Sequence, residues 1–265
     1  MKFPIFKSRK DNVPIISNAA IEDTVGDILW DFDPSLLEVP KALDVDKFVE
    51  EYLRIDFDFP YLSHTGFIFG KTIFRPTIVT IYDKTNNIAD EIPIHNPTIL
   101  IDNRLNEKGK ENLYRSTVMH ESAHYVLHQG YYLQDPIYMD QGFEPFTNCS
   151  DTDICGSDGK KKLVTARDFL EHHAKFASAA FLMNRSAMTR LCTDESVIHD
   201  AFRRNPHFPN SELAAIVAET FKVSEESARI RMRILNLEIT EDKMEDVSDY
   251  SIHPVNHMSL AGIIT

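Results

Sequence analysis

The sequence predicts an α+β fold, with a small antiparallel sheet followed by long helices. Three runs rich in β-branched and aromatic residues, at 66–74, 76–83 and 97–104, are bounded by Gly, Pro, Asn and Asp and indicate strands. Two longer segments, 110–128 and 165–183, have the length and the apolar spacing of helices. Strands in one part of the chain and long helices in the next are typical of the α+β class.

The remaining segments are predicted in chain order. Residues 1–40 show little periodicity and carry acidic clusters, so we expect an irregular leader on the surface. The segment 43–53 has one apolar face at helical spacing, formed by Val45, Phe48, Val49, Tyr52 and Leu53. The second long helix begins near Thr165, which together with Asp168 resembles a capping box.

Two shorter helices, 211–221 and 224–238, are predicted near the end of the chain. Between the two long helices, residues 129–164 are rich in Gly, Pro, Asn and Asp and are predicted to be an insertion loop. We therefore divide the chain into a leader (1–40), a main domain (41–200) with this insertion, and a helical C-terminal appendage and tail (201–265).

Composition narrows the class of function. The formal net charge is −13, which argues against broad contact with nucleic acid or anionic membranes. We find no signal peptide and no apolar run of roughly 20 residues that could span a membrane. Three cysteines do not make a disulfide framework, so a reducing cytoplasm is the simplest expectation.

The segment VMHESAHYVLH, residues 118–128, contains a motif with metal-binding spacing. His120 and His124 are four residues apart on the predicted helix, so both imidazoles can point at one ion. Glu121 is rotated about 100° from His120 and cannot ligate on that face, but it can reach a water held by the metal. Zinc lowers the pKa of such a water towards about 7. The motif thus supplies two ligands, an open position and a base, and a true metal site is favoured over a chance spelling.

A catalytic zinc needs a third protein ligand. The second long helix offers four candidates within two turns, namely Asp168, Glu171, His172 and His173. The residues alone do not choose among these four side chains, and exposure on the helix surface is the ordinary alternative for His172 and His173.

Two segments resemble the ImmA/IrrE family of bacterial metallopeptidases. The segment HESAHYVLH is similar to the family's zinc motif, which commonly ends in Leu-His. EHHAKFASAAFLMN resembles the family's later helix, E-x-x-A-N-x-F-A-A-x-L-L-M-P, and keeps its spacing at Glu171, Ala174, Leu182 and Met183. Residues 48–63 and 221–235 resemble further family segments. The chain departs from the family pattern at Lys175, Phe176, Phe181 and Asn184.

The resemblance implies a zincin-like fold, with a long active-site helix and a second metal-ligand helix. It implies Glu171 as the third ligand, so the expected zinc ligands are His120, His124 and Glu171, with Glu121 as the catalytic base. It also implies a peptidase that makes limited cuts in a helix-turn-helix repressor of a stress or mobile-element regulon. Zinc suits two His and one Glu best, although manganese and cobalt also bind such sites.

Other features remain open. Tyr125, His128, Tyr131 and Tyr132 are candidate donors to an oxyanion, although His128 is better explained by packing or hydrogen bonding in the last helical turn. A second metal site at Cys149 and Cys155 is conceivable, but their spacing is not that of a zinc ribbon. His253 and His257 are four residues apart, but the proline between them argues against a regular helix that would pair them.

Residues 211–238 resemble a helix-turn-helix, with arginines at 229, 231 and 233. Nearby glutamates cancel that charge, which argues against DNA binding. The alternative to the peptidase is a non-catalytic or latent zinc-binding regulatory protein, and a fourth protein ligand would favour it.

Overall fold

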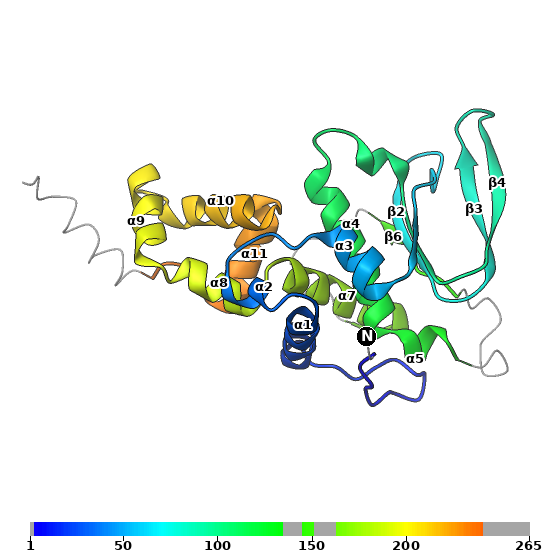
Figure 1. The fold of residues 1–265 in the computed structure, drawn as a ribbon, viewed down its shortest axis with the longest axis horizontal. Coiled ribbons are helices and arrows are strands. Elements are labelled where there is room, and N and C mark those ends of the chain that lie inside the picture. The colour runs from blue at the N-terminus through cyan, green and yellow to red at the C-terminus, as the bar shows by residue number, and fades with distance from the viewer. Residues whose placement is uncertain (1–2, 135–144, 151–162, 241–265) are drawn as a thin grey trace, which may run out of the picture.

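The structure, a computed structural model, describes residues 3–134, 145–150 and 163–240. Two long helices, α4 (Glu111–Leu127) and α7 (Ala166–Leu182), cross its centre (Figure 1). A four-stranded sheet and a separate β-hairpin lie on one side of them, and helices α8 to α11 lie on the other. The predicted α+β class is confirmed.

The four-stranded sheet is mixed, with strand order β1-β5-β2-β6. β1 (Asp56–Asp58) runs parallel to β5 (Thr98–Ile101). β2 (Ile68–Ile73) is antiparallel to β5 and to β6 (Cys149–Ser150). The prediction of an antiparallel sheet is therefore wrong for the β1–β5 pair. The reason is that β1 has only three residues, too few for an alternation from which a strand could be recognised.

The hairpin consists of β3 (Thr77–Asp83) and β4 (Ile88–Ile94), which pair in antiparallel register. β4 was not predicted, because most of its residues are exposed and its sequence IADEIPI holds two acidic residues and a proline. A small second core lies between the hairpin and the sheet, formed by Leu62, Ile73, Val79 and Leu100.

The predicted helices are confirmed. α4 and α7 lie where periodicity placed them, and α7 begins with a complete capping box between Thr165 and Asp168. The predicted helix at 43–53 forms as α3 (Val45–Lys47) and the π-helical turn η1 (Phe48–Leu53). α10 (Pro209–Phe221) and α11 (Glu225–Leu235) are the two C-terminal helices, and η2 (Asn103–Asn106) is a 3-10 turn before α4.

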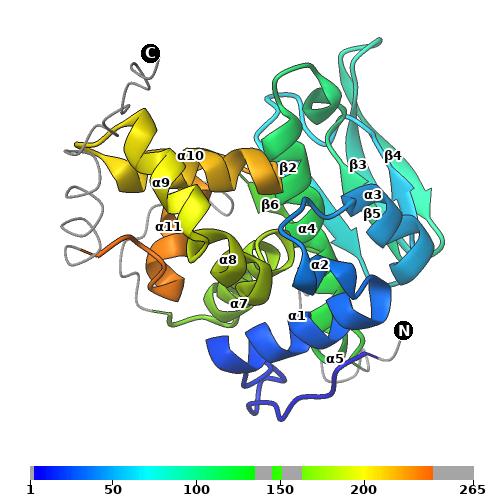
Figure 2. The same cartoon turned by 60° about the vertical axis from the view of Figure 1, so that its left-hand side comes forward.

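The expectation of an irregular leader over residues 1–40 is wrong for its second half. Residues 18–32 form α1 (Asn18–Phe32), which Ser17 caps, and α2 (Ser35–Glu38) follows. α1 packs against α7, as the turned view shows (Figure 2). Its buried face consists of Glu22 and of the apolar residues Ile21, Val25, Ile28 and Leu29, whose helical period is interrupted by acidic residues.

Two further helices and part of the insertion also depart from expectation. α8 (Arg185–Cys192) and α9 (Glu195–Arg204) connect α7 to α10. Within the predicted loop 129–164, the structure has the short helix α5 (Gln129–Tyr132) and strand β6, and residues 135–144 and 151–162 lie outside the described residues. None of the helices in the described ranges is long and apolar enough to cross a membrane.

Candidate metal centre

The HESAH motif lies on the buried half of α4. Every residue of α4 from Thr117 to Leu127 is buried, because β2 and β5 cover one side of the helix and α7 covers another. His120 is 2% exposed, and Glu121 and His124 are fully buried. Three ionisable side chains in an interior need partners or an ion, since burying an isolated charge is costly.

The side chains of His120, His124 and Glu171 converge. Nε2 of His120 lies 3.1 Å from Nε2 of His124 and 3.1 Å from Oε2 of Glu171, and the third side of this triangle is 3.4 Å. α4 supplies the two histidines and α7 supplies the glutamate. The three residues thus form a group that could hold a metal ion.

The triangle has the dimensions of a metal-ligand set. Donor atoms about 2.0–2.1 Å from a tetrahedral zinc lie roughly 3.3 Å from one another. The three observed separations, 3.1–3.4 Å, match this value. Two nitrogens and one carboxylate oxygen also form the donor set of a catalytic zinc that keeps its fourth position for water or substrate. The residues therefore fit zinc.

Of the four candidate third ligands, only Glu171 reaches the two histidines. The carboxylate of Asp168 caps the start of α7 by accepting hydrogen bonds from the backbone N–H of Thr165 and Val164. His172 lies 3.1 Å from the side chain of Asn18 on α1. His173 points towards His128, with ring centroids 5.8 Å apart.

The carboxylate of Glu171 is poised as an anion. Burial by itself raises its pKa, but the neighbouring imidazoles of His124 and His120 lower the pKa far below its usual range. The side chain is 18% exposed, so it forms the partly open side of the triangle. An anionic oxygen beside two imidazoles is the arrangement that a divalent cation stabilises.

His128 supports His124 from behind. Its Nδ1 lies 3.0 Å from Nδ1 of His124. If Nε2 of His124 ligates, its Nδ1 carries the proton and donates to Nδ1 of His128, which fixes the tautomer. Burial is the main cause that lowers the pKa of His128 well below its usual value, so this ring is neutral. His128 therefore contacts His124 at the end of the helix as a neutral ring, in agreement with the explanation by packing or hydrogen bonding.

Glu121 is held by two threonines that the sequence did not reveal. The hydroxyl of Thr72 on β2 lies 2.6 Å from Oε2 of Glu121, and so does the hydroxyl of Thr147. Oε1 of the same carboxylate is buried and has no hydrogen-bond partner among the described residues. One oxygen is thus fixed by two hydroxyl groups, and the other is buried beside Gly70 without a described hydrogen-bond partner.

Gly70 permits this contact between β2 and α4. A Cβ atom at Gly70 would lie 2.8 Å from Cγ of Glu121 and 2.9 Å from its Oε1. No side chain other than hydrogen fits at this position without a shift. A glycine inside a strand-like run signals such a close approach, and the segment 66–74 carries one in its middle.

Cys149 lies beside the motif. Its Sγ lies within 4.8 Å of ligand atoms of His120 and Glu121, and the residue is 1% exposed. Cys155 and the two histidines of the tail, His253 and His257, lie outside the described residues. Cys149 is therefore associated with the HESAH motif itself.

Among the tyrosine candidates, Tyr132 has the strongest electrostatic link to the site. Burial raises the pKa of Tyr132 well above its usual value, and the charges of Glu171 and Glu121 raise it further. Both Tyr125 and Tyr132 pack on Phe74, with ring centroids 6.1 and 4.2 Å away. Tyr131 packs edge-on against Tyr132. Tyr132 keeps its proton and lies in electrostatic range of both carboxylates.

The arginines of α11 are engaged within the protein. Arg231 is 1% exposed and makes a two-pronged ion pair with Glu22 of α1, with distances of 2.6 and 3.0 Å. Arg229 pairs with Glu225 and Glu226 of its own helix. α11 therefore joins the helical end of the molecule to α1 rather than presenting these two arginines to DNA phosphates.

Comparisons with known proteins add no family assignment. No protein-family model matches the chain, and no curated protein sequence matches it significantly.

Proposed function

We propose that this chain is a zinc-dependent metalloendopeptidase with a zincin-like fold, which makes limited cuts in a protein substrate. The observation that carries the proposal is the triangle of His120, His124 and Glu171, with Glu121 beside it on the same helical turn. A purely structural zinc site has no use for a buried carboxylate at this position. The resemblance to the ImmA/IrrE family suggests a helix-turn-helix repressor as the substrate, and three cysteines without a disulfide framework favour the cytoplasm as the location.

Each side chain has a distinct part in the proposed mechanism. The two imidazoles and Glu171 would hold the zinc, which, when bound, acidifies a water and polarises a carbonyl group. Oε1 of Glu121, the oxygen that no described residue engages, would take a proton from the attacking water and pass it to the leaving amine. Thr72 would keep that carboxylate in place through Oε2.

Two further features favour catalysis on a protein chain. The hydroxyl of Tyr132, which keeps its proton, is the proposed donor to the tetrahedral oxyanion. A cavity of about 420 Å³ between α4, α7 and α11 reaches His120 and is lined largely by apolar groups, among them Leu113, Leu182 and Ile234. Such a cavity suits the side chains of a peptide that approaches the metal from this end.

The experiment is a cleavage assay with three matched variants. The substrates are fluorescein-labelled casein and, where one is encoded beside the gene, a helix-turn-helix repressor. Glu121→Gln should retain zinc and lose cleavage, whereas Glu171→Ala should lose both. His172→Ala, one residue further along the same helix, should keep both. Zinc bound without cleavage of either substrate, both by the wild type and by Thr147→Val, whose native hydroxyl contacts Glu121, would refute the proposal and favour a regulatory zinc protein.

A further inference from the structure

Residues 145–150, which we call the edge segment, line the outer edge of β2. Ser150 pairs with Ile68 and Cys149 with Gly70. The N–H of Thr147 donates to the carbonyl oxygen of Thr72 at 3.1 Å, and the N–H of Phe74 donates to that of Pro145 at 3.0 Å. The edge of β2 beside Glu121 is therefore covered by the chain itself.

The side chains of the edge segment alternate between two faces. Thr147 and Cys149 face α4, where the hydroxyl of Thr147 contacts Glu121 and the sulfur lies near His120. Phe146 and Asn148 face the opposite side of the sheet. Because side chains alternate along a strand, Thr147 and Cys149 lie at the candidate metal centre, whereas Phe146 and Asn148 lie away from it.

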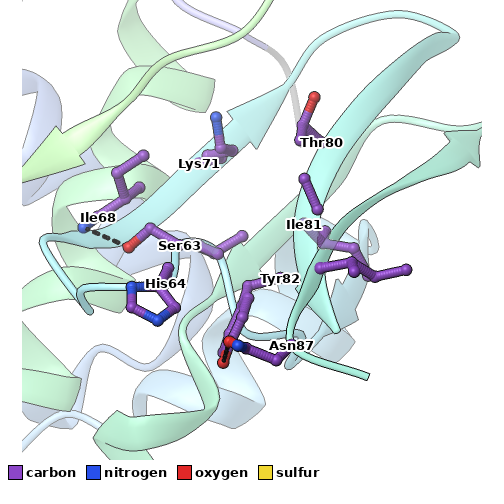
Figure 3. A pocket seen from close by; sticks show the side chains of 11 residues that line it. Ser63, His64, Ile68, Lys71, Thr80, Ile81, Tyr82 and Asn87 are labelled. Atoms are coloured by element: carbon purple, nitrogen blue, oxygen red, sulfur yellow. Dashed lines mark hydrogen bonds between the residues drawn. The ribbon is translucent and has the colours of Figure 1, made fainter. Parts of the chain in front are cut away.

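Lys71 holds the edge segment from the face opposite Glu121. Its ammonium group lies 4.7 Å from the ring centroid of Phe146 and donates a hydrogen bond to Oδ1 of Asn148. Lys71 is only 6% exposed. It borders a cavity of about 470 Å³ between β2 and the hairpin, whose far wall includes Thr80, Ile81 and Tyr82 (Figure 3).

An extended peptide binds most directly to a sheet by adding a strand to a free edge, through main-chain hydrogen bonds. The β2 edge is the one that borders Glu121, and the edge segment occupies it. Glu121 is fully buried, and Thr147 takes up one of its carboxylate oxygens. A substrate strand therefore cannot pair with β2 until the edge segment leaves.

We propose that the edge segment occupies the position of the substrate strand and keeps the peptidase latent until it is displaced. This inference rests on the proposed function and adds its regulation. If Thr147 instead positions Glu121 and so aids catalysis, the change in cleavage on its substitution has the opposite sign. Removing its hydroxyl raises cleavage if the edge segment blocks the site, and lowers cleavage if Thr147 orients the base.

Displacement is measured through Cys149, which is buried while the edge segment is paired. Cys155→Ser and Cys192→Ala leave Cys149 as the one remaining thiol of the chain. The reaction rate of this thiol with Ellman's reagent is then followed without substrate, in the zinc-loaded and zinc-free protein. Each variant that loosens the edge segment is made twice. It is made in this single-cysteine background for labelling, and in a chain with all three cysteines for the assay of casein cleavage.

Two variants loosen the edge segment in different ways. Thr147→Val removes the hydroxyl at Glu121, and Lys71→Met removes the cation on the opposite face. The matched control is Lys84→Met, since Lys84 also lies over an aromatic ring, that of Tyr61, and no described contact joins it to the edge segment. Loss of one charge-assisted contact should raise the labelling rate roughly tenfold. Cleavage of casein should rise by a similar factor.

The outcomes separate the two claims. Labelling rates of Thr147→Val and Lys71→Met that equal that of Lys84→Met overturn the latent state, as does a fall in cleavage by Thr147→Val with unchanged labelling. Faster labelling together with faster cleavage supports it. Absence of cleavage in every zinc-loaded variant refutes the proposed function instead, while the labelling rate still reports whether the edge segment opens.

Discussion

Replacing Gly70 by alanine tests the close contact between β2 and the base-bearing turn of α4. The new methyl carbon would lie 2.8 Å from Cγ of Glu121, 2.9 Å from its Oε1 and 2.9 Å from Cγ2 of Thr117. Carbon atoms in favourable contact are about 3.5–4.0 Å apart. Because all three neighbours belong to buried residues of a packed helix, either the strand or the side chain of Glu121 must move.

The magnitude follows from two opposing terms. Overpacking in an interior costs about 1–3 kcal/mol, and alanine recovers about 0.5–1 kcal/mol because glycine is entropically unfavourable in a strand. The two terms leave a net loss of up to about 2.5 kcal/mol. Contacts as short as 2.8 Å favour the upper part of this range, roughly 1–2 kcal/mol, equivalent to a Tm lower by about 2–8 °C. A displacement of Glu121 by part of an ångström should lower cleavage about 10- to 100-fold. Zinc content should not change, since Glu121 is not a ligand.

The assay combines thermal unfolding, zinc content and casein cleavage for Gly70→Ala. Gly26→Ala is the matched control, because no heavy atom lies within 4 Å of a Cβ at that position of α1. The control should gain about 1 kcal/mol of helix stability and keep full activity. Equal stability and cleavage in the two variants would show that Gly70 carries no close contact, and the account of Glu121 would be wrong.

Three further predictions concern residues around the site and the helical end. Arg231→Ala should lower the free energy of unfolding by about 3–5 kcal/mol because it leaves the buried carboxylate of Glu22 without its partner. The matched control Arg229→Ala, at a partly exposed position, should lower it by less than about 1 kcal/mol. Similar losses for the two variants in urea titrations would contradict the buried ion pair. His128→Phe should weaken zinc affinity about 10- to 100-fold, because Nδ1 of His124 loses its acceptor, and an unchanged Kd would rule out that support. Tyr132→Phe should lower kcat about 10²- to 10³-fold with little change in KM; a change in KM alone would exclude a role in stabilising the oxyanion.

Periodicity and capping predicted the long helices because those signals are local. The capping box at Thr165 and the apolar face of residues 43–53 lie within a few residues of sequence, and both are present in the structure. α1 was missed because acidic residues interrupt its apolar face. β1 was missed because three residues are too few to show a strand period.

The same distinction between local and long-range signals applies to the residues of the candidate site. Spacing on one helix was enough to pair His120 with His124 and to set Glu121 apart from them. The choice of Glu171 over its neighbours needed the orientation of α7 against α4, which no local pattern contains, and only the resemblance pointed to it. Thr147 was not foreseen, because it contacts Glu121 from 26 residues away through a strand pairing within an apparent loop.

The central claim is that His120, His124 and Glu171 hold one zinc ion, and elemental analysis of the purified protein tests it most directly. The account predicts close to one zinc per chain in the wild type and in His172→Ala, and almost none in Glu171→Ala. Zinc retained in Glu171→Ala but lost in His172→Ala or His173→Ala would contradict the ligand set. A wild-type protein that binds no metal would contradict the site altogether.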